Sequence, residues 1–439
     1  MRAKIDSLGN WRRTHYSKDI RPSEEGKEVT VFGWVSGIRN QGGIVFVIMT
    51  DKDGVAQITV HKDRVSKEVL SRVESLSDHA SIAVKGKIKA MGKAPNGAEI
   101  IPDEFKVLAL PQKTPPFTLN AKTLPSPDKR FEIRAVDLRR PEALAIFKVR
   151  EKALESIREF LKEHGYYEIN TPKIIATATE GGAALFPLLY YDKEAFLTQS
   201  PQLFKEQLVM PFEKVFEIAP AYRAEQSRTL HHLSEFLSVD VEEAFVDYKD
   251  IMNTVEKMIV KLYASVGKEC AKELKTLGTT VELIERIPRM TYDAILELLK
   301  GKNAQVEWGD DLTSELLDKI AEDLPSYYFV IDWPTKSKPF YIKPSSNAEI
   351  SESFDLMHGS LEIASGGTRL SSKKDLVSRL KEKGLKPKGF EYHLAVFDYG
   401  MPPHAGFGLG FERLLMVLTN QKNIREVSAF PRDQFRLTP

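Results

Sequence analysis

The chain has 439 residues, of which 42% are hydrophobic and 28% charged, so we expect a soluble protein of two or three globular domains. Its formal net charge at pH 7 is +1, which excludes an overall basic field, so any contact with nucleic acid must use local patches. Cys270 is the single cysteine, which excludes a disulfide framework and a cysteine-rich metal site, and without a signal peptide or a long apolar run the expected location is the cytoplasm.

Residues 28–110 consist of short β-type runs separated by Gly and Asp-Gly turns, with one helical stretch near residues 67–76. Five strands with a helix among them predict a small OB-type barrel, and we expect residues 1–110 to form this first domain. Such barrels bind single-stranded nucleic acid through exposed aromatic and polar side chains. Phe46 is a candidate to stack on a base and Gln57 to hydrogen-bond a base edge, the alternative for Phe46 being a place in the barrel core.

Residues 111–134 are rich in proline and charge, lack a hydrophobic period and predict a linker between two domains. An amphipathic helix is expected over residues 141–164, followed by a strand, YYEINTPKII, that Pro172 interrupts. Because proline inside a strand belongs at an edge or an interface, this helix and strand are a candidate dimer element. The small residues at 176–184 predict a loop that closes over a ligand.

Residues 214–245 predict two strands joined by a long polar loop. Alternation along each strand collects polar and aromatic side chains on one face of the pair. An arginine, acidic residues and an aromatic ring that are held in place on a sheet suit an anionic, aromatic ligand such as a nucleotide. The alternative is that this face of the sheet is simply exposed to solvent. The side chains expected on this face and in its loop are Glu217, Arg223, Glu225, Arg228, His231, His232, Phe236, Ser238, Asp240 and Glu242.

The rest of the chain contains three further features. A turn entering a helix is expected at residues 198–210, with Ser200 as its N-cap. Residues 247–324 are mostly helical and charged, and we interpret them as an accessory helical insertion. Near the C-terminus, a Gly-rich strand at residues 406–410 runs directly into a helix that starts near Phe411.

Three separated blocks occur in this order: the strand with Pro172, the strand with Arg223 and its loop, and the sequence GLGFER at residues 408–413. Together they resemble motifs 1, 2 and 3 of the class II aminoacyl-tRNA synthetases. The barrel, the segment QSPQLFK and the terminus FPRDQFRLTP are similar to the aspartyl enzymes of the archaeal and eukaryotic type, which belong to subclass b. The resemblance covers residues 14–439. It implies an α+β catalytic domain at residues 135–439, an antiparallel sheet flanked by helices, and a homodimer formed through the motif 1 helix and strand.

The resemblance also implies that ATP and Mg²⁺ are cofactors. Arg223 matches the arginine on the α-phosphate, where a guanidinium stabilises charge that builds on the oxygens. Phe236 and Arg413 match the pair that holds the adenine between an aromatic ring and a planar guanidinium. The residues that match the ATP site are Arg223, Ala224, Glu225, His231, His232, Leu233, Phe236, Glu362, Gly410, Phe411, Glu412 and Arg413.

The metal and amino-acid ligands follow from the same resemblance. Asp355, Glu362 and Ser365 match the ligands of Mg²⁺, which prefers hard oxygen atoms, and the alternative is that these are surface acids. Lys205 and Arg369 match two cations that meet the side-chain carboxylate of aspartate, and so charged a pocket should reject asparagine. The residues that match the aspartate site are Glu180, Ser200, Gln202, Lys205, Arg223, Asp240, Ser365 and Arg369.

In the barrel, Phe46 and Gln57 match the positions that read the anticodon, and Ser36 lies at a variable position near its third base. The expected function is therefore activation of L-aspartate by ATP, followed by transfer of the aspartyl group to the 3′ end of tRNA(Asp), with charging of tRNA(Asn) left open. Three alternatives are an asparagine- or lysine-specific relative, a small-molecule amide ligase on the same catalytic fold, and a non-catalytic tRNA-binding paralogue.

Overall fold

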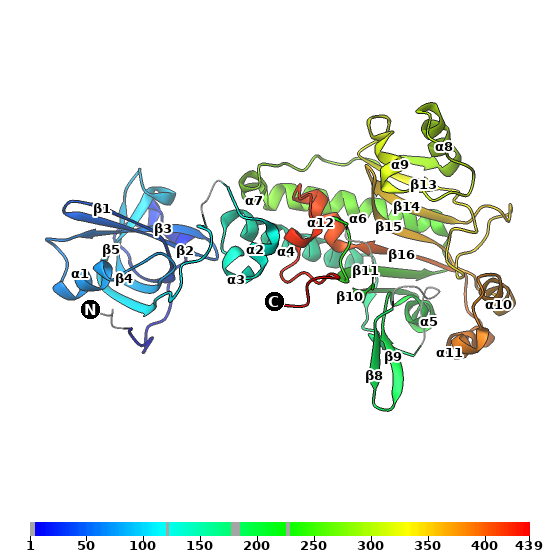
Figure 1. The fold of residues 1–439 in the computed structure, drawn as a ribbon, viewed down its shortest axis with the longest axis horizontal. Coiled ribbons are helices and arrows are strands. Elements are labelled where there is room, and N and C mark those ends of the chain that lie inside the picture. The colour runs from blue at the N-terminus through cyan, green and yellow to red at the C-terminus, as the bar shows by residue number, and fades with distance from the viewer. Residues whose placement is uncertain (1–4, 120–122, 177–184, 225–228) are drawn as a thin grey trace. The chain divides into compact units, whose positions relative to one another are not determined.

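The computed structural model describes residues 5–119, 123–176, 185–224 and 229–439. The chain divides into two compact units, Met1–Arg130 with Ala135–Leu144 and Phe131–Arg134 with Ala145–Pro439 (Figure 1). The region expected as a linker contains a short helix, α2 (Pro127–Phe131). Over the described part of the chain, no helix combines the length and the apolar character that crossing a membrane requires.

The first unit contains a closed barrel whose strand order is β1-β2-β3-β5-β4. Helix α1 (Lys67–Glu74) follows β3, and the Ser66 hydroxyl caps its N-terminus by accepting from the Val69 amide at 3.2 Å. Alternate residues of each strand fill the barrel core, which confirms the prediction of a small barrel of five strands. The strands are β1 (Glu28–Gln41), β2 (Ile44–Asp51), β3 (Gly54–His61), β4 (Ser81–Ala90) and β5 (Ala98–Ala109).

The second unit is built on an eight-stranded sheet with the order β12-β13-β14-β15-β16-β11-β10-β6. The six strands from β13 to β10 pair antiparallel as expected, whereas both edge strands, β12 and β6, pair in parallel with their neighbours. The strands are β6 (Tyr167–Glu168), β10 (Lys214–Tyr222), β11 (Glu235–Ala244), β12 (Arg289–Thr291), β13 (Tyr327–Ile331), β14 (Ser353–His358), β15 (Leu361–Thr368) and β16 (His404–Gly410).

The strand expected across Pro172 is split between two sheets. Its first part, β6, joins the large sheet, and its second part, β7 (Ile174–Ile175), joins a small sheet with β8 (Pro187–Tyr190) and β9 (Lys193–Leu197). The amide and the hydroxyl of Thr171 each donate to the carboxylate of Glu217 at 2.8 Å, so the chain turns away from the large sheet just before the proline. The β8–β9 hairpin extends outward from this unit (Figure 1).

Three helices share the main core of the second unit: α4 (Pro141–Glu163), α6 (Tyr248–Glu269) and α12 (Phe411–Leu418). The helix α6 was expected to belong to an accessory insertion, but its apolar residues recur at helical spacing and pack against β14, β15 and β16. It is therefore part of the core. The other helices are α3 (Arg134–Asp137), α5 (Gln202–Phe212), α7 (Ala271–Thr276), α8 (Tyr292–Gly301), α9 (Ser314–Asp318), α10 (Lys373–Glu382) and α11 (Glu391–Leu394).

Candidate active site

The site is built on the hairpin of β10 and β11, which pairs from Lys214 opposite Glu243 to Tyr222 opposite Glu235. The strand β16 pairs with the other edge of β11, and β15 pairs with β16, so that Asp240, Gly408 and Ser365 lie in one row across three strands. Successive side chains of a strand point to opposite faces. Accordingly, Val239 and Val241 are buried in the core while the predicted polar and aromatic residues of β11 face a cavity.

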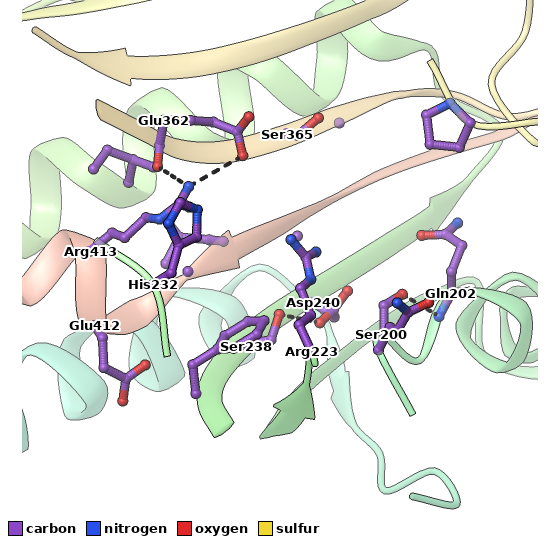
Figure 2. Close-up of a pocket in the computed structure, with 18 of the residues that line it drawn as sticks. Ser200, Gln202, Arg223, His232, Ser238, Asp240, Glu362, Ser365, Glu412 and Arg413 are labelled. Carbon is purple, nitrogen blue, oxygen red and sulfur yellow. Dashed lines mark hydrogen bonds and ion pairs between the residues drawn. The ribbon is translucent and has the colours of Figure 1, made fainter. Parts of the chain in front are cut away.

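The cavity has a volume of about 260 Å³. Figure 2 shows Arg413, His232 and Glu362 at one end, Ser200 and Gln202 at the other, and Arg223 and Asp240 between them. The structure thus brings together residues that are more than 200 positions apart in the chain. The predicted site residues that line the cavity are Ser200, Gln202, Arg223, His231, His232, Leu233, Phe236, Asp240, Glu362, Ser365, Arg369, Gly410, Glu412 and Arg413.

Four of the predicted site residues do not line this cavity. The Phe411 side chain is fully buried in the core, so its ring cannot contact a nucleotide in this cavity. Ala224 lines a separate cavity of about 620 Å³ beside the C-terminal tail. Lys205 and Asp355 are buried and each contacts a residue of the cavity wall. Glu180 and Glu225 lie outside the described residues.

One end of the cavity is organised around Arg413, at the start of α12. Its guanidinium donates to the carbonyl oxygens of Glu362, at 2.9 Å, and His231, at 3.3 Å, and its Nη2 lies 3.0 Å from Nε2 of His232. Since arginine only donates, Nε2 of His232 must accept, which leaves the proton on Nδ1 facing the hydroxyl of Thr229. Burial and the charge of Arg413 lower the pKa of His231.

The middle of the cavity contains the second arginine. The guanidinium of Arg223 lies 5.4 Å from the centre of the Phe236 ring, within the range of a cation–π contact. The backbone amide of Arg223 donates to the carbonyl of Ser234 at 2.9 Å, which fixes the base of the loop at the end of the hairpin. Arg223 and Arg413 together make this part of the cavity suitable for an anion with an aromatic group.

Glu412 also lines the cavity, but its carboxylate is already hydrogen-bonded within the protein. It accepts from Arg150 at 3.0 Å and from the backbone amide of Leu237 at 2.8 Å. These bonds connect α12 to α4 and to β11. The role of Glu412 in this structure is therefore to hold the wall of the cavity in place.

The other end of the cavity is a buried network of charges. Nε and Nη2 of Arg369 donate to the Glu242 carboxylate at 2.9 and 3.2 Å, and Nη2 also donates to Gln202 at 3.3 Å. Nζ of Lys205 lies 3.0 Å from Asp240 and 3.4 Å from Glu242. Both cations predicted for substrate binding thus have carboxylate partners, so the pocket is less positive than the sequence suggested.

Glu242 is a residue to which the sequence assigned no role. Although burial opposes the charge on Arg369, Glu242 outweighs this effect and raises the pKa of the guanidinium above its ordinary value. A Cβ atom at Gly406, on the neighbouring strand, would lie 2.2 Å from the Glu242 carboxylate, so glycine is needed there. The alternation along β11 predicted that Glu242 shares a face with Asp240, but not that it pairs with Arg369.

A second buried cluster lies behind Gln202. The side-chain nitrogen of Gln202 donates to the Glu206 carboxylate at 2.7 Å. This carboxylate lies 3.2 Å from His393 and 3.7 Å from His404. Burial opposes the charge of Glu206, but the two histidines outweigh it and keep the pKa of this carboxyl well below its ordinary range. The same pairing raises the pKa of His404 in spite of burial.

The predicted metal ligands lie on β14 and β15. Asp355 is directly opposite Ser365 in the strand register, and Glu362 is on the same strand as Ser365. Asp355 is 3% exposed, which excludes the alternative that it is a surface acid. Oxygen donors of this kind suit Mg²⁺, although no three His, Cys, Asp or Glu side chains of the described residues form a ready metal site.

In the barrel unit, the predicted base-reading residues lie on neighbouring strands. Phe46 is half-buried, and the core of β2 is made by Val45, Val47 and Met49 instead. Gln57 donates to Glu99 at 3.0 Å, and the Thr59 hydroxyl, opposite Phe46, donates to Glu99 at 2.6 Å. The alternative that Phe46 belongs to the barrel core is therefore wrong.

Glu99 was not predicted as a site residue. It is 1% exposed, and its Oε1 atom has no hydrogen-bond partner among the described residues. The parallel pairing of Gln57 with Glu99, between β3 and β5, brings it to this face. Such a pairing between distant strands cannot be read from the local sequence.

Comparison with family models gives two matches. Residues 126–434 match the family described as tRNA synthetases class II (D, K and N), and residues 29–108 match the family described as OB-fold nucleic acid binding domain. The first match includes the whole cavity wall and the second includes most of the barrel.

Individual relatives match over nearly the full chain. The aspartate–tRNA(Asp/Asn) ligases of Methanothermobacter thermautotrophicus and Methanocaldococcus jannaschii are 46% and 47% identical, over 98% of this chain and 100% and 99% of their own. Among solved structures, the asparaginyl-tRNA synthetase of Pyrococcus horikoshii with asparaginyl-adenylate has a TM-score of 0.92 at 33% identity, over 98% of this chain and 100% of that one. The aspartyl-tRNA synthetase of Entamoeba histolytica has a TM-score of 0.85 at 28% identity, over 98% and 93%.

Proposed function

The chain belongs to the class II tRNA synthetases of the D, K and N group, and from this premise we propose that it is an aspartate–tRNA ligase. It uses ATP to convert L-aspartate to aspartyl-adenylate and pyrophosphate, and it then transfers the aspartyl group to the 3′ end of tRNA. The observation that carries the proposal is a single cavity with Arg413 at one end, Arg223 in the middle, and Arg369 hydrogen-bonded to Gln202 at the other end. Such a cavity can hold a phosphate and a carboxylate at once.

At the phosphate end, positioning and electrostatic stabilisation are sufficient for catalysis. Arg223 meets the α-phosphate and stabilises the charge that develops as the aspartate carboxylate attacks. Phe236 offers its ring to the adenine, and Arg413, fixed by Glu362 and His232, covers the opposite side. Glu225 belongs to the same assignment but lies outside the described residues.

Mg²⁺ is assigned to Asp355, Glu362 and Ser365. The fit rests on their oxygen donors and on the register that sets Asp355 opposite Ser365. When bound, the ion neutralises charge on the phosphate oxygens of ATP.

At the amino-acid end, Arg369 meets the side-chain carboxylate of aspartate, with Lys205 behind it. Both cations are already held by Glu242 and Asp240, which keeps them in place without substrate. Gln202 and Ser200 supply neutral hydrogen-bonding groups on the same wall. Asp240 and Glu180 are assigned to the substrate ammonium, and Glu180 lies outside the described residues.

The tRNA anticodon is assigned to the outer face of the barrel, where Phe46 stacks on a base and Gln57, held by Glu99, reads its edge. We further assign both tRNA(Asp) and tRNA(Asn) as substrates, because the relatives of 46% and 47% identity carry both in their names. The active form is assigned as a homodimer through α4, β6 and the segment around Pro172.

Pyrophosphate exchange tests the first step. We expect exchange that depends on L-aspartate, and we expect Arg223→Ala to reduce it at least a hundredfold, because the enzyme loses a contact made to the reacting phosphate. Full exchange by Arg223→Ala would overturn the proposed site.

Asparagine specificity is the second candidate, favoured by the TM-score of 0.92 to an asparaginyl enzyme. The same assay distinguishes the two, because exchange supported by asparagine and not by aspartate would establish that alternative. Charging of neither tRNA by an enzyme that exchanges normally would limit the function to amino-acid activation.

A further inference from the structure

Lys338 lies on the segment between β13 and β14 and was not expected in the site. It lines the cavity, and its ammonium donates to both oxygens of Asp355, at 2.8 and 2.6 Å. The same ammonium lies 4.2 Å from the centre of the Trp333 ring. Lys338 is 9% exposed and Asp355 3%, so this ion pair is buried at the edge of the cavity.

The position of this ion pair conflicts with metal binding at Asp355. A Mg²⁺ ion needs a carboxylate oxygen at about 2.0–2.1 Å. Both Asp355 oxygens are within hydrogen-bond distance of Lys338, so a metal ligated there would lie very close to the ammonium. Two positive charges at that separation repel strongly in a site with little water. Metal and ammonium therefore compete for Asp355.

We propose that Lys338 is the built-in counterion of the metal site, which holds Asp355 until Mg²⁺ displaces the ammonium from it. The inference rests on the proposed function, because it takes Asp355 as a metal ligand. The four-carbon stem of lysine allows the ammonium to leave Asp355 without a change in the backbone. The phosphates of ATP are the anions available to the released ammonium, so metal and nucleotide load together.

Burial is the physical reason for such a counterion. It raises the pKa of Asp355, and the nearby Glu362 adds to this effect, whereas Lys338 opposes both. Without a cation, the ligand-free site would contain two close acids, one of them buried. The two hydrogen bonds from Lys338 fix the position of the Asp355 carboxylate, so the metal ligand is in place before the metal arrives.

Binding of Mn²⁺ to the enzyme without ATP, measured by electron paramagnetic resonance, tests the competition. We expect Lys338→Met to bind Mn²⁺ at least tenfold more tightly than the wild type. We expect Lys338→Arg, which retains the charge, to stay within about twofold of the wild type. Lys343→Met is the matched control. Lys343 lies on the same segment, and its partner is Glu352, at 2.9 Å, which is not one of the proposed metal ligands.

A second readout follows the indole beside the ammonium. Addition of Mg²⁺ and ATP should change the fluorescence of Trp333 in the wild type, and Trp333→Phe should abolish that change. In Lys338→Met, the Trp333 emission without ligands should already differ from that of the wild type. It should then stay constant when Mg²⁺ and ATP are added. An equal change in both proteins would overturn the displacement.

The outcomes separate this inference from the proposed function. Unchanged or weaker Mn²⁺ binding by a folded Lys338→Met, with a wild type that binds the ion, would overturn the counterion role and leave the metal site standing. Absence of Mn²⁺ binding in every variant, with and without ATP, would overturn the metal site itself. If Lys338→Met does not fold, Lys338→Gln takes its place, because the amide retains one donor to Asp355 without the charge.

Discussion

Arg369, the cation proposed to bind the substrate carboxylate, is held in place by a buried carboxylate of the protein itself. Its guanidinium is 3% exposed and is bound by the Glu242 carboxylate through two hydrogen bonds. A buried ion pair stabilises little in itself, but loss of one partner leaves an uncompensated buried charge. The network therefore makes stability and substrate binding depend on the same residue.

Glu242→Gln should lower the free energy of unfolding by about 3 kcal/mol, because Arg369 loses its buried partner. Urea unfolding followed by circular dichroism measures the change. Glu352→Gln is the control, since the partner of Glu352, Lys343, is exposed and such a pair contributes less than about 1 kcal/mol. Equal losses of stability from the two substitutions would show that Glu242 is not needed to balance the buried charge of Arg369.

The pH dependence of stability should contain a contribution from His404. Its folded-state pKa is raised by Glu206 above the ordinary value of 6.5, with Glu242 adding to the effect. A group of this kind stabilises the fold fully below its unfolded pKa, and the stabilisation is lost as the pH rises through the folded pKa. The melting temperature should therefore fall above pH 6.5, and His404→Gln should remove part of that slope. His164→Gln, at an exposed site, should leave the slope unchanged.

Individual residues could be predicted where a strand pattern fixed them. Phe236 and Asp240 follow from alternation along β11. Arg413 was assigned instead through the resemblance of GLGFER to motif 3, and it lies at the start of α12 as that motif implies. Lys338 could not be found in this way, because its segment has no period and its partner is on a different element. The paired state of Lys205 and Arg369 was also beyond the sequence, since it depends on strands that meet only in the folded sheet.

At the level of elements, the surface around Pro172 supports the proposed dimer. Tyr167 and Ile174 are 60% and 48% exposed, and Phe212 is 40% exposed with its ring 5.4 Å from that of Tyr167. The β8–β9 hairpin adds Leu189 and Tyr191, which are 80% and 84% exposed. Exposed large apolar side chains, two of them in ring contact, are typical of a protein interface.

Tyr167→Glu combined with Phe212→Glu should convert the dimer to a monomer, because a charge would be buried without a partner at the interface. Light scattering during size-exclusion chromatography at micromolar concentration measures the mass. Leu283→Glu, at a position 75% exposed outside this segment, should leave the dimer intact. A wild type with the mass of one chain would refute the dimer.

Helices and strands could be predicted from the sequence where a hydrophobic period extends over several helical turns or several strands. The barrel strands, α4 and the β10–β11 hairpin agree with their patterns. The strand at Pro172 was predicted as one element but divides into β6 and β7, because each half satisfies its hydrogen bonds in a different sheet. The helix α6 has an apolar face that the sequence shows, but it packs on β14, β15 and β16, the first of which begins only at Ser353, far beyond the end of the helix at Glu269.

For the whole molecule, the proposed function assigns the choice of tRNA to one unit and the chemistry to the other. Phe46, Gln57 and Glu99 belong to the barrel unit, whereas every residue of the cavity belongs to the other. A change in the barrel should therefore alter the kinetics of charging and leave aspartate-dependent pyrophosphate exchange as it is. Ser36 is the residue that we expect to set the ratio of the two tRNAs.

Ser36 lies in β1 where the pairing with β2 shifts between Val35 and Gly37, and its hydroxyl donates to the Ile48 carbonyl at 3.3 Å. A bulge of this kind turns a side chain out of the regular alternation, so a larger residue would project from the barrel. The wild type should charge tRNA(Asp) and tRNA(Asn) transcripts with similar kcat/KM, and Ser36→Gln should favour tRNA(Asp) by about tenfold, the effect of one unfavourable polar contact. Phe46→Ala should reduce kcat/KM for both tRNAs equally, by roughly tenfold or more, because stacking is tolerant of sequence. Charging of tRNA(Asp) alone by the wild type would show that discrimination does not depend on the size of residue 36.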